Sequence, residues 1–124
     1  MNMSVKVGKS VIRVHVRRDN SYDLIERGIK YIEVRLLKGI VCNIEVGDIV
    51  NIVHKCKKTR VKILEIKVFS SLSEMLKDKL IREGALPGLD ISECKDYYEQ
   101  FYDKRQIEKY KAVALLFRCV EGVM

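Results

Sequence analysis

The sequence predicts a single α+β domain over residues 1–124, a small mixed β-barrel of about five to six strands with helices inserted before the last strand. Three observations lead to this fold class. Apolar and polar residues alternate over residues 11–17, which is typical of a half-buried strand. The apolar positions change parity within residues 59–69, and such a β-bulge lets a small barrel bend. The final apolar segment, residues 112–120, predicts a central strand.

The first third of the chain alternates strand and helix. The strand at residues 11–17 has a basic outer face. Asp19 or Asn20 is expected to cap a short helix, because both side chains accept hydrogen bonds from free backbone N–H groups. Gly28 is expected to end that helix in a left-handed conformation. A second strand then runs to about Leu37, since strand-forming residues dominate this stretch.

Two further strands are expected in the middle of the chain. A turn at Gly47 and Asp48 leads into a strand over residues 49–54. A loop over residues 55–58 then leads into the long strand that carries the predicted bulge. Together with the final strand, these segments supply the wall of the barrel.

Residues 70–109 have helical spacing. Ser70 or Ser71 is expected to cap a first helix that ends near Gly84. A second helix is expected to begin near Ser92, and a last helical turn spans residues 103–109. The spacing of the aromatic residues in the second helix favours a place in the core over base stacking. The apolar stripes are Leu72, Met75, Leu76 and Leu80 in the first helix, and Cys94, Tyr97, Tyr98 and Phe101 in the second.

Positive charge is concentrated in the first half of the chain. Residues 1–60 hold 13 Lys and Arg against 6 Asp and Glu, whereas residues 61–124 hold 11 against 11, so the whole net charge of +7 lies in the first half. Such asymmetry favours an anionic partner for one part of the fold. The alternative is that the charge serves solubility alone.

Several classes of protein are disfavoured by the sequence. No apolar run approaches the ~20 residues of a membrane span, and residues 1–10 lack a signal-peptide segment. The four cysteines are widely spaced and only two histidines accompany them, so neither a metal site nor another cofactor is expected. We interpret the cysteines as reduced thiols of an intracellular protein, cytoplasmic or, in a eukaryote, nuclear.

The most informative segment is the octapeptide of residues 28–35, with the pattern Gly-x-Lys-x-x-Glu-x-Arg. On a strand, Glu33 and Arg35 share one face, and Lys30 at the strand entry can approach Glu33. Arg35 suits a phosphate, and Glu33 could accept from an exocyclic amine of a base. Tyr31 could stack on that base. The alternative is an ion pair of Glu33 that braces the barrel wall.

This octapeptide, from Gly28 through Lys30 and Glu33 to Arg35, resembles the signature of ASCH domains. The resemblance extends over most of the chain: Gly47-Asp48 precedes a strand, and a Leu-Pro-Gly turn lies at residues 86–88. It includes the Phe-Ser-Ser-Leu entry to a helix at residues 69–72 and Tyr98-x-x-Phe101-Tyr102. ASCH domains are similar to PUA domains, so the resemblance implies a PUA-like barrel and an RNA ligand. The cleft would be lined by Gly28, Lys30, Tyr31, Glu33 and Arg35.

The resemblance also raises the question of catalysis. Some small bacterial ASCH domains are amidohydrolases that remove the acetyl group of N4-acetylcytidine, and nuclease activity has been proposed for others. Lys30 matches their lysine, but Glu33 stands where they have a threonine as the proposed nucleophile. Glu83 is the nearest match to their third catalytic residue, an acid after the first inserted helix. As an enzyme the chain would therefore use Lys30, Glu33 and Glu83, with Glu33 activating a water.

Two basic groups lie outside the octapeptide. One is the stripe of Arg13 and Arg17, extended by Arg18, and the other is the group of Lys55, Lys57, Lys58 and Arg60. Both could follow a nucleic-acid backbone and add affinity that depends on salt. The alternative is a solvated loop and sheet edge.

The first interpretation of the sequence is therefore an RNA-binding ASCH domain that holds a nucleotide or base. The second is a small amidohydrolase acting on a modified nucleoside. The third is a module that binds a protein partner, because coactivator-type proteins carry such domains.

Overall fold

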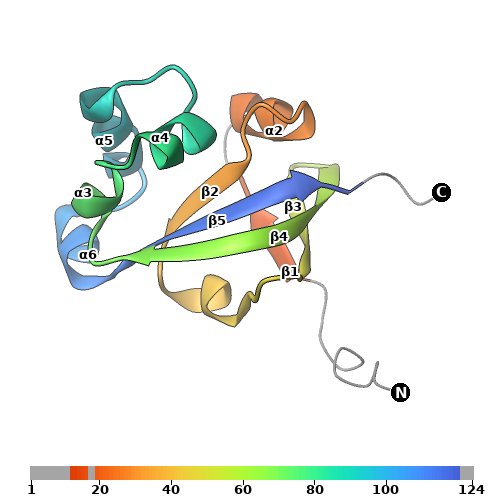
Figure 1. Cartoon of the computed structure of the whole chain (residues 1–124), viewed down its shortest axis with the longest axis horizontal. Coiled ribbons are helices and arrows are strands. Elements are labelled where there is room, and N and C mark those ends of the chain that lie inside the picture. The colour runs from red at the N-terminus through yellow and green to blue at the C-terminus, as the bar shows by residue number, and fades with distance from the viewer. Residues whose placement is uncertain (1–11, 17–18, 121–124) are drawn as a thin grey trace.

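The computed structural model of the protein describes residues 12–16 and 19–120. Figure 1 shows five strands in one strongly curved mixed sheet, with most of the helices gathered at one end. The strands are β1 (Ile12–His15), β2 (Ile32–Leu36), β3 (Ile49–His54), β4 (Lys57–Phe69) and β5 (Ala112–Cys119). The helices are α2 (Asp19–Glu26), α3 (Leu72–Met75), α4 (Lys79–Ala85), α5 (Ile91–Glu99) and α6 (Lys104–Lys109), and a 3₁₀ segment, η1, spans Gly39–Asn43.

The sheet order is β1-β3-β4-β5-β2, so β1 and β2 are its two edges. β1 pairs with β3 in parallel, whereas the other three pairings are antiparallel. The sheet curls into a half-barrel, and four of the helices precede β5 in the sequence after β4. This confirms the predicted small α+β barrel with helices inserted before the last strand. β5 has a paired neighbour on each side, as its apolar sequence indicated.

The predicted bulge is present in β4. The pairing with β5 changes register between Ile63 and Glu65, so Leu64 is the additional residue. Its side chain is exposed, because the extra residue turns it away from the core. The alternation predicted for β1 is confirmed, with Val14 buried and Arg13 exposed. Val11, Arg17 and Arg18 lie outside the described residues, as do the side chains of Asp19 and Asn20.

The helical region differs from the prediction at its start. The single helix expected from Ser71 to Gly84 is two helices, because Asp78 starts a new one by accepting hydrogen bonds from the backbone N–H groups of Leu80 and Ile81. The restart changes the phase, so Leu80 is 67% exposed and Ile81 is 1% exposed. The predicted place of Leu80 in the apolar stripe was therefore wrong.

Other predicted boundaries agree to within one or two residues. Ser71 caps α3, as expected, by accepting from the N–H of Glu74 at 3.1 Å. α5 begins at Ile91, next to the predicted Ser92, because Asp90 and Glu93 form a capping box. The loop expected at residues 55–58 is shorter, since β4 starts at Lys57 and leaves only two residues between the strands.

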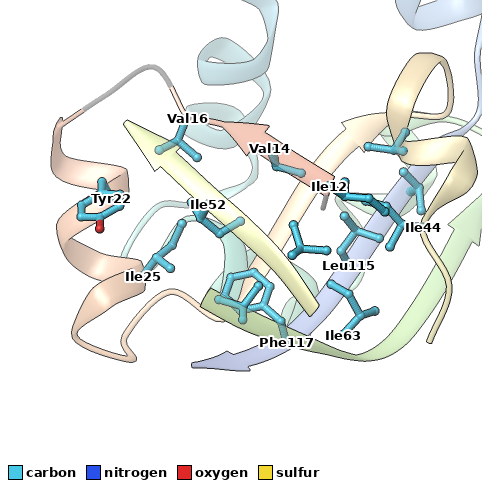
Figure 2. Packing of buried hydrophobic residues seen from close by; sticks show 14 residues of the cluster. Ile12, Val14, Val16, Tyr22, Ile25, Ile44, Ile52, Ile63, Leu115 and Phe117 are labelled. Carbon is cyan, nitrogen blue, oxygen red and sulfur yellow. The ribbon is translucent and has the colours of Figure 1, made fainter. Parts of the chain in front are cut away.

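Buried apolar side chains form two clusters. In the first, shown in Figure 2, Tyr22 and Ile25 of α2 meet side chains of β1, β3, β4 and β5. In the second, side chains of β2 and β5 pack against α3, α4 and α5. α4 approaches β2 closely at Gly84, where an added Cβ would lie 2.6 Å from Cγ1 of Ile32. In the described part of the chain no helix is long and apolar enough to span a membrane.

Candidate functional site

A pocket opens between the edge strand β2, the end of β1 and the helices α2 and α5. The cavity itself measures about 70 Å³, and about 550 Å³ of free space is present when the open solvent at its mouth is included. It lies where the two edges of the curved sheet come near each other. Its lining residues are His15, Val16, Ser21, Lys30, Glu33, Val34, Arg35, Tyr97, Tyr98, Phe101 and Tyr102.

The turn after α2 brings Lys30 to the pocket. Gly28 has a φ of 78°, a left-handed conformation that glycine adopts without strain. The backbone N–H groups of Ile29 and Lys30 both donate to the carbonyl of Leu24, at 2.9 and 3.0 Å. These bonds satisfy the helix end and direct the chain into β2. Gly28 does not line the pocket, but it sets the place where Lys30 begins.

The Lys30 side chain is buried and held by three acceptors. Its Nζ donates to the carbonyls of Ile32 at 2.7 Å and Ala85 at 2.8 Å, and lies 3.3 Å from Oε1 of Glu33. A protonated amine has three N–H groups and a neutral one has two, so this arrangement fits the ammonium. Lys30 therefore ties β2 to the end of α4 and to Glu33.

Glu33 and Arg35 continue this chain of charges across the pocket. Arg35 Nε donates to Oε2 of Glu33 at 2.6 Å, and its Nη2 donates to the carbonyl of His15 at 2.5 Å. His15 belongs to β1, which is the opposite edge of the sheet. Arg35 thus bridges the two sheet edges, and 28% of its side chain remains exposed.

Burial and ion pairing act against each other on these groups. Burial lowers the pKa of Lys30, although the attraction of Glu33 opposes the change. Burial alone would raise the pKa of the Glu33 carboxyl, but the attraction of Lys30 and Arg35 outweighs it and lowers that pKa. Glu33 is therefore an ionised acceptor at neutral pH. Two cations and one carboxylate leave the cluster with a net positive charge.

Aromatic side chains form the facing wall of the pocket. The Tyr97 ring meets those of Tyr98 and Phe101 edge to face, with centroids 5.2 and 5.1 Å apart. The Tyr97 hydroxyl lies 3.5 Å from Oγ of Ser21, so α5 also touches α2. Tyr98 is buried beside Glu33, and burial together with that negative charge holds the pKa of its hydroxyl well above the usual value. Tyr97, Phe101 and Tyr102 are half-buried.

Sequence reasoning missed this aromatic wall as part of a pocket. The predicted core stripe is correct for Cys94 and Tyr98, which belong to the second cluster. The aromatic residues, however, occupy positions 97, 98, 101 and 102, which cover a wider arc than one core-facing stripe. The width of this arc could have indicated that some of these rings lie outside the core. His15 and Ser21 carried no comparable signal, because distant parts of the chain bring them to the pocket.

Besides Gly28, the predicted cleft residue Tyr31 and the predicted catalytic residue Glu83 lie outside the pocket lining. Tyr31 is 42% exposed and is not among the residues that line the pocket. Its N–H donates to the carbonyl of Gly84 at 3.0 Å, and its ring lies close to that glycine. Glu83 is exposed on α4, also outside the pocket lining. The structure therefore brings together Lys30, Glu33 and Arg35 alone among the predicted cleft and catalytic residues.

The described members of the predicted basic groups lie on the surface. Arg13 is exposed on β1, while Arg17 is outside the described residues. Lys55, Lys57, Lys58 and Arg60 are exposed around the β3–β4 hairpin. Among the residues that the structure describes, no group of three or more His, Cys, Asp or Glu side chains could hold a metal ion.

Comparison with known proteins places the fold. No protein-family model and no curated protein matches the chain. The chain is similar to hypothetical protein PH0355, whose crystal structure superposes with a TM-score of 0.73. The two sequences are 36% identical, and the match covers 88% of this chain and 100% of PH0355. The solution structure of protein PF0455 from Pyrococcus furiosus is 32% identical, with a TM-score of 0.70, over 90% and 99%. An ASCH domain from Lactobacillus crispatus is 13% identical, with a TM-score of 0.59, over 96% and 85%.

Proposed function

Because the chain belongs to the same family as PH0355 and PF0455 and has the fold of an ASCH domain, we propose that it binds RNA and holds one nucleotide or base of the strand in the pocket. The observation that carries this proposal is the meeting of a net positive ion-paired cluster and an aromatic wall in one hollow. Single-stranded RNA is commonly recognised by stacking of splayed bases on aromatic rings, together with hydrogen bonds to base edges.

Each side of the pocket has groups that match part of a nucleotide. The bonds from Arg35 to Glu33 and His15 use two of its five N–H groups, so further donors are available for a phosphate or a base acceptor. A carboxylate has about four lone-pair sites, so Glu33 can accept from an exocyclic amine while it pairs with Lys30 and Arg35. Phe101 and the neighbouring tyrosines offer surfaces for stacking.

The same geometry favours binding over hydrolysis of N4-acetylcytidine. A lysine acts as a base only after it loses a proton, and three acceptors hold the Lys30 ammonium. The lowered pKa of Glu33 makes this carboxylate a weaker base toward water. Glu83, the candidate third catalytic residue, lies outside the pocket lining.

Calorimetric titration of the four nucleoside monophosphates and of short single-stranded RNA tests the proposal. Phe101→Ala should weaken binding roughly 5- to 150-fold, because stacking of one base on an aromatic ring contributes about 1–3 kcal/mol. Leu64→Ala, which removes an exposed apolar side chain outside the pocket lining, is the matched control and should retain nucleotide affinity.

The result that would contradict the proposal is absence of binding to every nucleotide and RNA tested. Equal affinities for the Phe101→Ala variant and the unaltered protein would place any binding outside this pocket. Incubation with N4-acetylcytidine, followed by chromatography for released cytidine, tests the hydrolase alternative with the same samples.

A further inference from the structure

A second hollow lies beside the β3–β4 hairpin, and the proposed nucleotide pocket does not include it. The Lys57 ammonium lies 5.9 Å from the centre of the Tyr22 ring, and that ring stacks on His54 with centroids 6.3 Å apart. The side chains of Tyr22, His54 and Lys57 thus lie close together in its lining. The hollow is lined by Tyr22, Asp23, His54, Lys55, Cys56 and Lys57.

The hairpin around this hollow is strongly basic. Residues 55–60 contain three lysines and one arginine and no acidic residue, and all four cations are exposed. Asp23 is the single carboxylate in the lining, so the local balance remains positive. A concave surface with excess positive charge attracts phosphate groups and raises their local concentration. Tyr22 is 2% exposed, so its ring offers little surface for stacking a base.

The two hollows are neighbours. Ser21 lines the nucleotide pocket and the next residue, Tyr22, lines the second hollow. Likewise, Val16 lines the pocket, and its carbonyl lies 2.8 Å from Nδ1 of His54, which lines the second hollow. Among the described residues, adjacent positions on α2 and the contact between Val16 and His54 therefore join the linings of the two hollows. The basic hairpin thus adjoins the lining of the pocket.

We infer that the RNA strand whose nucleotide occupies the pocket continues to the β3–β4 hairpin, and that Lys55 and Lys57 bind its backbone phosphates at the second hollow. This inference rests on the proposed function, because it assigns a path to the same strand. The hairpin then contributes affinity without reading sequence, since contacts to phosphates position a strand and contacts to bases specify it. The pocket would supply the preference for one base.

Salt dependence separates the two contributions. Each phosphate contact on a single strand steepens the dependence of log affinity on log salt by about 0.7. Removal of two lysines should therefore reduce the slope by about 1.4. The salt concentration rises fourfold between 50 and 200 mM, and four raised to the power of about 1.4 is about seven. Over this range the RNA affinity of the unaltered protein should therefore fall by about sevenfold more than that of the variant.

The experiment compares Lys55→Asn/Lys57→Gln with the control Lys77→Gln/Lys79→Gln, in which two exposed lysines at the α3–α4 junction are neutralised. Asparagine is chosen at position 55 because the residue there has a φ of 55°, which asparagine tolerates. The probes are nucleoside monophosphates and nine-nucleotide single-stranded RNAs of one base each. Circular dichroism checks that every variant is folded.

The inference predicts that the hairpin variant keeps its affinity for the monophosphate and loses affinity and salt slope for the RNA, while the control keeps both. An unchanged salt slope in the hairpin variant, together with weaker RNA binding by Phe101→Ala, would overturn the role of the hairpin in phosphate binding. The proposed binding of a nucleotide in the pocket would still be supported. Equal effects in the control would overturn the role of the hairpin as well, because general charge would explain them. RNA that fails to bind the unaltered protein would overturn both proposals.

Discussion

Replacement of Lys30 by methionine is expected to lower the free energy of unfolding by about 3–5 kcal/mol. The methionine fills nearly the same volume, so the loss comes from the missing ammonium rather than from a cavity. Three acceptors lose their partner, and Glu33, which is 7% exposed, keeps a buried charge with only Arg35 beside it. Breaking one side of a buried ion pair typically costs this amount, because the other charge is left without compensation.

Urea unfolding followed by circular dichroism and tyrosine fluorescence measures this loss. The chain has six tyrosines and no tryptophan, so the tyrosine signal is not masked. The double variant Lys30→Met/Glu33→Gln should lose less stability than the sum of the losses in the two single variants. The difference should be about 0.5–3 kcal/mol, because the two residues interact directly. A loss below about 1 kcal/mol for Lys30→Met would refute a structural role for this ammonium and would restore Lys30 as a free chemical group.

Three other changes test the structure. The fold lowers the pKa of Glu33 from 4.5, so the stability that its carboxylate contributes is present above pH 4.5 and is lost as the pH falls through the lowered pKa. In urea unfolding from pH 7 to pH 3, the free energy of unfolding of Glu33→Gln should therefore decrease less than that of the unaltered protein. Gly84→Ala should lower the free energy of unfolding by about 1–3 kcal/mol, because the alanine Cβ would lie 2.6 Å from Cγ1 of Ile32. An unchanged melting temperature would contradict this close approach of α4 to β2. Ile81→Ala should lower the free energy of unfolding by about 2–5 kcal/mol and Leu80→Ala by less than about 0.5 kcal/mol, because Ile81 is buried and Leu80 is exposed. Similar melting temperatures for the two variants would mean that α4 turns a different face to the core.

Local patterns predicted most of the fold because they report on local physics. Alternation in β1 and the parity change in β4 follow directly from which side chains face the core. The break between α3 and α4 was harder, since Leu76 and Leu80 have helical spacing across it. Asp78 decides the matter by capping a new helix, and an aspartate between two helical stretches can be read either as a cap or as a solvated residue.

The candidate site was only partly predictable for a different reason. Lys30, Glu33 and Arg35 lie within six residues, so strand geometry placed them together. The aromatic wall and His15 come from segments far away in sequence, and their meeting depends on how far the sheet curls. Tyr31 is the converse case, because it is adjacent in sequence to the cluster but is not among the residues that line the pocket.

The contact between Arg35 and the His15 carbonyl also concerns the behaviour of the protein in concentrated solution. β1 and β2 are the sheet edges, and an unprotected edge is a template on which a second chain can add a strand. In this fold the edges approach each other, and one arginine fills the gap between them. Arg35 thus joins the two edges at this point, where its side chain would hinder the addition of a strand from a second molecule.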